Sequence, residues 1–385
     1  MNVYVRSIRI GFKMATQRKT SSGKKKMTKK EKAKRRQKKI MILLGEIIAV
    51  IVLALLLYFV VISDKIEKTN FSKDEIKMNE GIDNGVELED VSMNNLQSDH
   101  MKGYRNIALF GVDSRKGALG KGTLSDTILV ASINEQTKEV KLISIYRDTY
   151  LNLGNDTYNK ANSAYSKGGP AQAINMLNMN LDLNITDYVT VGFRGVVDTV
   201  DALGGVTIDV DSEEQFHLNN YQIGTSEALG RSYTPLNSTG MVKLDGMQAT
   251  SYCRIRYTAG DDFKRAERQR EVIKAIVEEA QKASPAKLNQ IANDTFPQIA
   301  TSLELSEVLS LMDGVKEYQL AGSSGFPFDE LRASGTVGSK GSCVMPVDLT
   351  ANVSQLHLFL FGQEGYDPSQ TVKDCSAKIR QDTGK

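Results

Sequence analysis

The sequence predicts an α/β domain, a layered α-β-α sandwich around a central mixed sheet, behind an N-terminal transmembrane helix. Two observations support this fold class. From residue 104 onward, short apolar runs typical of strands alternate with amphipathic helical patterns, which indicates helices on both faces of a sheet. Before that, residues 40–62 are apolar except for Glu46, and a run of about 23 residues is long enough to span a bilayer.

The first hundred residues divide by composition. Residues 1–39 hold sixteen Lys and Arg against Glu31, a net charge of +15, whereas the formal total of +3 leaves −12 for the rest of the chain. We expect a basic cytoplasmic tail at 1–39 that touches anionic membrane lipids, a transmembrane helix at 40–62 and an extracytoplasmic stalk at 63–98. The alternative for 40–62 is a cleaved signal peptide, whose apolar region is usually shorter and ends at small residues.

Two further segments follow the stalk. We expect the main folded domain at 99–280 and a C-terminal extension of the same extracytoplasmic domain at 281–385. Nucleic acid is not an expected partner, because the basic tail lacks the interleaved aromatic residues that stack on bases.

The elements of the folded part follow in order. We expect strands at 104–113, 127–134, 139–148, 185–193, 206–210, 250–257 and 318–324. We expect helices at 170–181, 194–205, 261–280, 286–293, 306–314 and 351–362. Residues 213–240 suggest a polar excursion, and a short helix begins near residue 244.

Charged residues lie at the ends of three expected strands. Asp113 and Arg147 lie at the ends of the first and third strands, and Asp126 directly precedes the second. In α/β sheets ligands bind outside strand ends, so these side chains are well placed for a site. A lone Asp there is also a common turn former or cap. Two carboxylates that bracket a glycine-rich loop favour instead a hard cation such as Mg²⁺ that bridges to phosphate oxygens.

The stretch 252–270 concentrates positive charge in an otherwise acidic body, with six Lys and Arg against three acidic residues. On the expected strand at 250–257, Arg254 and Arg256 point to the same face. On the following helix, one stripe carries polar residues first and apolar residues later; it consists of Asp262, Arg265, Gln269, Ile273 and Ile276. The alternatives are a solvated charged face and an anion site, and the shared stripe favours the anion site.

The three cysteines and three histidines argue against a zinc site, because no paired ligand spacing is present. Cys343 and Cys375 are consistent with either a disulfide or free buried thiols. Cys253 is expected to be buried under its strand.

Six motifs in order resemble the LytR-CpsA-Psr family over residues 104–280. They are GVDSR at 111–115, SDTILVASIN at 125–134, SIYRDTY at 144–150, NKANSAY at 159–165, VDALGGV at 200–206, and RIRY followed by DDFKRAERQ at 261–269. Two positions depart from the family pattern. Leu124 stands where an Arg is usual, and Tyr146 stands where a Pro is usual.

The resemblance implies an envelope enzyme, with 99–280 as its catalytic domain. Such enzymes transfer a glycopolymer (teichoic acid, capsule or another envelope glycan) from a polyprenyl-pyrophosphate carrier to a peptidoglycan hydroxyl. It implies that Mg²⁺ is held by Asp113, Asp126 and Asp262. It also implies catalytic roles at the diphosphate for Asp113, Asp126, Arg147, Arg254, Arg256 and Arg265. We assign Lys160, Arg268 and Gln269 to substrate binding.

Other functions remain open alternatives. A hydrolase of the same lipid diphosphate would use nearly the same groups, and a non-catalytic envelope binding or regulatory protein would need only the anion site. No His lies in the matched motifs, so a carboxylate is the expected general base.

We also expect an apolar slot for a polyprenyl tail, although ordinary core packing explains the same residues. Its walls would be the helices at 170–181 and 194–203, with Met176, Leu177, Val196, Val197 and Val200.

Overall fold

The computed structural model describes residues 71–82, 99–114, 119–258 and 260–385. The basic tail expected at 1–39 and the membrane helix expected at 40–62 lie outside these ranges. Within the ranges, no helix combines the length and the apolar character that crossing a bilayer requires.

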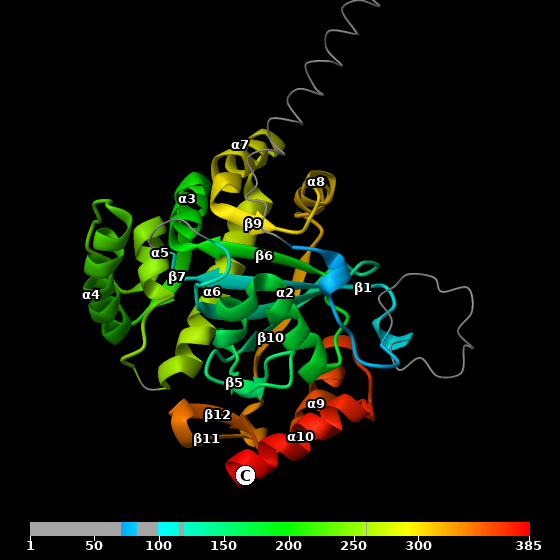
Figure 1. The fold of residues 1–385 in the computed structure, drawn as a ribbon. Coiled ribbons are helices and arrows are strands. Elements are labelled where there is room, and N and C mark those ends of the chain that lie inside the picture. The colour runs from blue at the N-terminus through cyan, green and yellow to red at the C-terminus, as the bar shows by residue number, and fades with distance from the viewer. Residues whose placement is uncertain (1–70, 83–98, 115–118, 259) are drawn as a thin grey trace, which may run out of the picture. The chain divides into compact units, whose positions relative to one another are not determined.

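A mixed six-stranded sheet forms the centre of the fold (Figure 1). Its strands in spatial order are β10 (Gln319–Phe326), β3 (Glu139–Ile145), β2 (Ser125–Asn134), β1 (Tyr104–Val112), β6 (Asp187–Gly192) and β9 (Ile299–Thr301). The β1/β6 and β10/β3 pairs are parallel, and the other three are antiparallel. The predicted central mixed sheet is confirmed.

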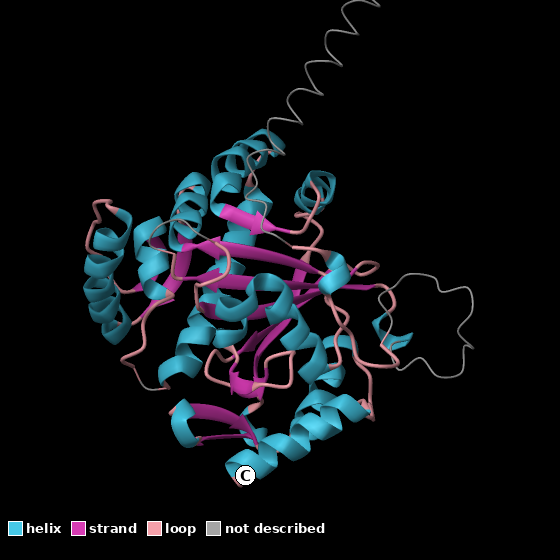
Figure 2. Cartoon of the chain, in the orientation of Figure 1, coloured by secondary structure: helices cyan, strands magenta, loops and turns pink. Residues whose placement is uncertain are grey.

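Side chains of β1 alternate between the two faces of this sheet. Ala108, Phe110 and Val112 are buried in the largest apolar core, together with α2 (Asn162–Leu181), α9 (Leu349–Phe361) and α10 (Gln370–Thr383). Leu109 points to the opposite face, toward α3 (Phe193–Leu203) and α6 (Asp261–Lys282). Helices therefore cover both faces (Figure 2).

The remaining elements surround this centre. Four helices are α4 (Ser212–Leu229), α5 (Gly246–Tyr252), α7 (Pro285–Thr295) and α8 (Leu305–Asp313). Three strand pairs are β4 (Tyr150–Asn152) with β5 (Tyr158–Lys160), β7 (Val206–Val210) with β8 (Gly240–Leu244), and β11 (Arg332–Thr336) with β12 (Ser342–Pro346). Short 3₁₀ turns lie at Lys73–Glu75, Asp99–Met101, Phe296–Gln298, Asp329–Leu331 and Gly338–Lys340.

The expected strand at 250–257 is wrong. Asp245 and Gln248 form a capping box, in which each side chain accepts a hydrogen bond from the other residue's backbone N–H. This signature starts a helix, and α5 continues to Tyr252 because its residues are buried on every side. Arg254 and Arg256 therefore lie in the turn after α5, and not on a strand.

The polar excursion expected at 213–240 is also wrong over its first half, where α4 lies. A second capping box, between Asp211 and Glu214, starts this helix, and Gly230 ends it in the left-handed conformation. The sequence signal was the DSEE at 211–214. Buried residues such as Leu218 and Gln222 face the α5 side, where Thr225 contacts Ser251.

The helix predicted at 170–181 begins earlier than expected, at Asn162. Gly169 interrupts it with φ +67°, a conformation that favours glycine, and Pro170 starts the second segment. The expected Pro170 start is therefore the start of that second segment.

Part of the segment expected to be a stalk packs on the domain. The Phe71 ring lies 4.9 Å from that of Tyr188, Lys73 forms a 2.8 Å ion pair with Asp187, and buried Asn79 donates 2.6 Å to Asp182. Residues 71–82 are thus tied to β6 and to the end of α2.

The C-terminal third is built into the same sheet. β9 and β10 form its two edges, and α9 and α10 pack under α2. The three cysteines are free thiols, so the structure contains no Cys343–Cys375 disulfide.

Candidate functional site

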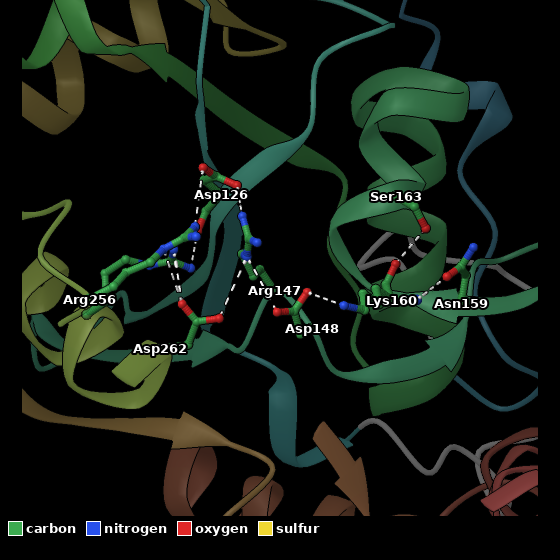
Figure 3. A network of polar contacts seen from close by, with 9 residues as sticks. Asp126, Arg147, Asp148, Asn159, Lys160, Ser163, Arg256 and Asp262 are labelled. Carbon is green, nitrogen blue, oxygen red and sulfur yellow. Dashed lines mark hydrogen bonds and ion pairs between the residues drawn. The ribbon is translucent and has the colours of Figure 1, made fainter. Parts of the chain in front are cut away.

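A network of ion pairs joins the start of β2 to the residues that follow β3 (Figure 3). Arg147 Nη1 donates to Asp126 Oδ1 at 2.5 Å, and its Nε lies 3.7 Å from Asp148 and 3.8 Å from Asp262. Both side chains are only partly exposed, so solvent screens this pair less than an open surface pair. Burial lowers the pKa of Arg147, but the three carboxylates outweigh it and raise the pKa above its ordinary value.

Asp262, at the start of α6, draws two more arginines into the network. Its Oδ1 lies 3.1 Å from Arg265 Nη1 and 3.5 Å from Arg256 Nε. Arg256 Nη2 also lies 3.9 Å from Asp126. Figure 3 shows the side chains of Asp126, Arg147, Arg256 and Asp262 turned toward one another. The arginines are thus held in place before any ligand binds.

Arg265 is the most deeply buried arginine of this network, with its side chain 5% exposed. Burial lowers its pKa to about 10, and the neighbouring Arg256 and Arg147 act in the same direction against Asp262. Three guanidinium groups close together in a partly dry site favour an anionic ligand with several oxygens.

A break in the strand register positions Asp126. Gly111 pairs with Thr127 and Val112 pairs with Ser125, so Asp126 is the extra residue of a bulge. Gly111 is required there, because a Cβ atom would lie 2.8 Å from Thr127. Asp113 follows β1 directly and lines the same cavity as Asp126.

Arg254 is held by aromatic rings. Its guanidinium lies 4.8 Å from the Phe193 ring centre and 5.7 Å from that of Tyr221, and it donates to Thr225 Oγ1 at 2.7 Å. These three partners come from α3 and α4. Sequence reasoning missed them, because α4 was not expected to be a helix.

A cavity of about 530 Å³ opens between the sheet and α3, α4, α5 and α6. Its polar part contains Asp113, Asp126, Arg147, Arg254, Arg256, Arg265 and Gln269. Its apolar part contains Leu109, Leu129, Val189, Val191, Val196, Val272, Ile273 and Ile276. Four residues of the predicted stripe on α6 line this one cavity, Arg265 and Gln269 in its polar part and Ile273 and Ile276 in its apolar part, whereas Asp262 does not line it.

The walls expected for an apolar slot are only partly right. Val196 lines the cavity, but Val197 packs with Leu229 and Met247 instead. Met176 and Leu177 belong to the core on the opposite face of the sheet. The sequence could not separate the two faces, because both are apolar.

Arg268, assigned to substrate binding from the sequence, lies apart from the cavity. Its side chain is 1% exposed, and its Nε donates to Glu214 at 2.9 Å. Its other nitrogens donate to the Ile255 carbonyl and to Thr258 Oγ1. Arg268 therefore ties the turn that carries Arg254 and Arg256 to α4 and α6.

Lys160 reaches the network indirectly. Its Nζ lies 3.3 Å from Asp148 Oδ1, and Asp148 contacts Arg147 (Figure 3). Asp148 was not among the expected site residues, although it follows Arg147 in the sequence. Leu124 is 46% exposed and adds no charge where the family usually has an Arg.

The described residues contain no group of three or more His, Cys, Asp or Glu side chains that would enclose a metal ion. Asp113 and Asp126 line one cavity, whereas Asp262 faces Arg147, Arg256 and Arg265. Asp113 and Asp126 fit a Mg²⁺ ion only if the ion is bound by one or two carboxylates together with the phosphates of a substrate.

Comparison with known proteins gives one consistent family. The family model LytR_cpsA_psr matches residues 66–334. The polyisoprenyl-teichoic acid–peptidoglycan teichoic acid transferase TagU of Oceanobacillus iheyensis is 32% identical over 215 residues, which cover 54% of this chain and 61% of that protein. The protein of the same name from Enterococcus faecalis is 31% identical over 235 residues, which cover 60% of this chain and 70% of that protein.

A solved structure agrees with these relatives. The crystal structure of TagV from B. subtilis superposes with a TM-score of 0.53 and 26% identity, covering 69% of this chain and 99% of that one. The family model covers well over half of the chain and includes every residue of the ion-pair network. The chain therefore belongs to the LytR_cpsA_psr family.

Proposed function

We propose that this chain is an enzyme that transfers a glycopolymer from a polyprenyl-pyrophosphate carrier to a peptidoglycan hydroxyl. One observation carries the proposal: a single cavity has an apolar part and an arginine-rich part, which match the two parts of a polyprenyl diphosphate. The names of the two TagU relatives support this proposal and favour teichoic acid over capsule as the polymer.

The arginines are proposed to bind the diphosphate. Planar guanidinium groups donate paired hydrogen bonds to phosphate oxygens, and Arg147, Arg254, Arg256 and Arg265 all line the polar part of the cavity. Phosphoryl transfer depends mainly on alignment and on stabilising charge, so a set of fixed cations is sufficient machinery. Asp126 and Asp262 hold the arginines in this arrangement, which lowers the cost of organising them when substrate binds.

The apolar part is proposed to hold the first portion of the polyprenyl tail. Leu109, Val189 and Ile273 offer it surface from the sheet and from α6. A tail bound there would also keep water from that side of the diphosphate, which favours transfer over hydrolysis.

Mg²⁺ is the proposed cofactor, with Asp113 and Asp126 as its protein ligands. When bound, the ion would neutralise charge on the phosphate oxygens. Asp262 is better placed to orient arginines than to hold the ion. A carboxylate that lines the cavity, Asp113 or Asp126, is proposed to accept the proton of the acceptor hydroxyl.

We further propose that residues 40–62 anchor the chain in the cell membrane, with the tail in the cytoplasm and the domain outside. A tag placed in residues 1–39 should resist external protease in intact cells, and a tag after Lys385 should be cleaved. The reverse pattern would refute this topology.

The central experiment incubates the purified full-length chain with a labelled lipid-linked teichoic acid precursor, peptidoglycan and Mg²⁺. The full chain is used so that residues 71–82, which pack on the domain, are present. We expect label attached covalently to peptidoglycan. Released polymer without attachment would support the hydrolase, and bound but unchanged donor would support a binding protein.

A further inference from the structure

A second cleft, of about 490 Å³, lies on the opposite side of α6 from the cavity. Phe263, Lys264, Glu267 and Arg270 of α6 line it, whereas Arg265, Gln269 and Ile273 face the cavity. The other walls are Tyr146, the end of β10 and the turn at 328–332. We call this space the Arg270 cleft.

The Arg270 cleft begins one residue away from the ion-pair network. Arg147 and Asp262 belong to the network, and their chain neighbours Tyr146 and Phe263 line the cleft. The cleft and the network therefore lie next to each other, on either side of the first turn of α6. The donor lipid has its own space on the other side of the helix.

Tyr146 builds the wall of the cleft, and it stands where the family usually has a Pro. Its ring packs 4.6 Å from that of Phe263, and its hydroxyl accepts a 2.9 Å hydrogen bond from Arg332. Gly325 makes room for it, because a Cβ atom there would lie 1.9 Å from the Tyr146 hydroxyl. The cleft is thus a fixed feature of this chain.

Arg270 is the cation of the cleft that lacks a carboxylate partner. Its Nη1 donates to Ser144 Oγ at 2.8 Å, but its Nε is buried with no hydrogen-bond acceptor, and no described carboxylate lies within ion-pair distance. By contrast, Arg332 pairs with Asp329 and Lys264 pairs with Glu267. Burial lowers the pKa of Arg270, and the more distant charges of Glu267 and Glu271 oppose this only in part.

The charge of the lining indicates what kind of anion fits. Three cations (Lys264, Arg270, Arg332) face three carboxylates (Glu267, Asp329, Glu330), so the cleft as a whole is neutral. A polyanionic polymer would be repelled as much as attracted. One carboxylate of a molecule with low net charge would satisfy Arg270 and leave Ser323, Ser324 and Gln355 to bind hydroxyl and amide groups.

We propose that the Arg270 cleft binds the acceptor through a free carboxylate of a peptidoglycan stem peptide. This inference rests on the proposed function and assigns the acceptor its own subsite. Donor and acceptor then approach the network from opposite sides of α6. Arg270 acts as a positioning and binding residue and takes no part in the chemical step.

The test compares two soluble peptidoglycan fragments, one with free stem-peptide carboxylates and one with those carboxylates amidated, using the full-length chain and the lipid-linked donor. We expect the wild-type chain to have a KM about 10- to 100-fold lower for the free-carboxylate fragment. Arg270→Gln should remove this preference and leave the donor KM unchanged. Lys274→Gln is the matched control and should behave as wild type, because Lys274 lies one turn later on α6, is exposed and does not line the cleft.

Direct binding of the two fragments to the full chain, measured without donor, gives a second readout that does not depend on transfer. Arg270-dependent binding of the free-carboxylate fragment supports the subsite even if no transfer occurs, and in that case only the proposed function fails. Equal KM values for the two fragments on the wild-type chain overturn the subsite while leaving the function intact. A rise in the donor KM of Arg270→Gln, with the acceptor unaffected, also overturns it and assigns the cleft to the donor polymer.

Discussion

Asp126 and Asp262 of the candidate site share their charge among several arginines. Asp262 has Arg147, Arg256 and Arg265 within 3.8 Å, and Asp126 has Arg147 and Arg256 within 3.9 Å. The cavity lining itself carries four arginines against two carboxylates, Asp113 and Asp126, so the surface that a ligand meets has an excess of positive charge. A diphosphate would supply the missing negative charge and release the arginines from competing with one another.

Arg256 is the network arginine with the most exposed side chain, so its removal should disturb the fold least. Charge-assisted hydrogen bonds are worth about 1.5–3 kcal/mol, and Arg256→Ala should therefore lower kcat/KM for the donor by about 10- to 100-fold. Arg256→Lys should recover only part of this, because an ammonium lacks the planar pair of donors. Steady-state transfer assays measure the loss, and a wild-type rate for Arg256→Ala would show that the side chain is merely solvated.

The proposed role of Asp113 is tested by metal titration. Asp113→Asn removes one charged ligand while keeping the size of the side chain, so the Mg²⁺ concentration for half-maximal transfer should rise by about 10-fold or more. Chelation of Mg²⁺ from the wild-type chain should abolish transfer. Undiminished transfer in EDTA would remove the ion from the proposal.

The buried Arg268–Glu214 pair should stabilise the fold and hold the turn after α5 in position. Removing one partner leaves the other charge buried, so Arg268→Met should lower the free energy of unfolding by about 3–5 kcal/mol. The double change Arg268→Met with Glu214→Gln should cost less than the single one. Urea denaturation measures both. Additive losses would mean that the two side chains do not act as a pair.

At the scale of elements, the sequence predicts secondary structure well where apolar periodicity is regular. It predicts secondary structure poorly where side-chain caps determine where a helix begins. The strands β1, β2 and β3 and the helices α3 and α6 follow clear apolar patterns. Asp126 and Arg265 lie within β2 and α6, and Asp113 and Arg147 lie just after β1 and β3. The turn after α5 was predicted as a strand, because Tyr, Cys and Ile favour strands in isolation. The capping box at Asp245 and tertiary burial overrode that preference.

The same limit applies to the site. The sequence predicts most of its cations and carboxylates, because their motifs are local, but not Asp148. It does not predict that Arg268 turns into the core or that Phe193, Tyr221 and Thr225 hold Arg254. Those contacts depend on how α3 and α4 pack, and packing between distant segments has no local pattern.

The apolar part of the cavity gives a prediction for α6. Ile273→Trp should fill the space beside Val189 and Val191, so affinity for a long-chain polyprenyl diphosphate should fall by about 10-fold or more, while affinity for a short-chain diphosphate should persist. Met241→Trp, at a position 71% exposed on β8, is the control. Val197→Trp is unsuitable, because Val197 is packed against Leu229 and Met247 and a larger side chain would disturb that core. Affinity that is independent of tail length in the wild-type chain would place the lipid elsewhere.

At the scale of the whole domain, one buried cluster joins the segments before and after the sheet to α2. The imidazole of His357 on α9 stacks on Tyr366 at 3.8 Å, and Tyr366 donates to Asp182 at the end of α2. Asp182 also accepts hydrogen bonds from Asn79 and Ser369. The cluster therefore connects residues separated by most of the folded chain.

The protonation state of His357 follows from its partners. Its Nε2 lies 2.9 Å from the Leu181 carbonyl, which only accepts, so this nitrogen carries the hydrogen. Its Nδ1 then accepts from His100 Nε2 at 2.7 Å. A proton added at Nδ1 of His357 would leave two N–H donors, this one and that of His100 Nε2, pointing at each other. Burial, followed by the neighbouring His100, lowers the pKa of His357 to about 3, and the hydrogen bond to Leu181 opposes this only in part.

This depressed pKa predicts how the stability of the domain depends on pH. Below the ordinary His pKa of about 6.5 the unfolded chain binds a proton at His357, while the folded chain stays neutral there until about pH 3. Stability contributed by this residue is therefore present at neutral pH and falls by about 1.4 kcal/mol per pH unit as the pH drops through that window. Urea denaturation between about pH 6.5 and pH 4 should show this slope added to that of the carboxylates.

His357→Gln should be less stable at pH 7, because the stacked and hydrogen-bonded ring is lost. Its stability should nevertheless fall less steeply with acid, by about 1.4 kcal/mol per pH unit. His217→Gln on α4, away from the cluster, should keep the wild-type slope. An unchanged slope in His357→Gln would mean that the folded chain protonates this ring as readily as the unfolded chain, and that the buried cluster opens before the domain unfolds.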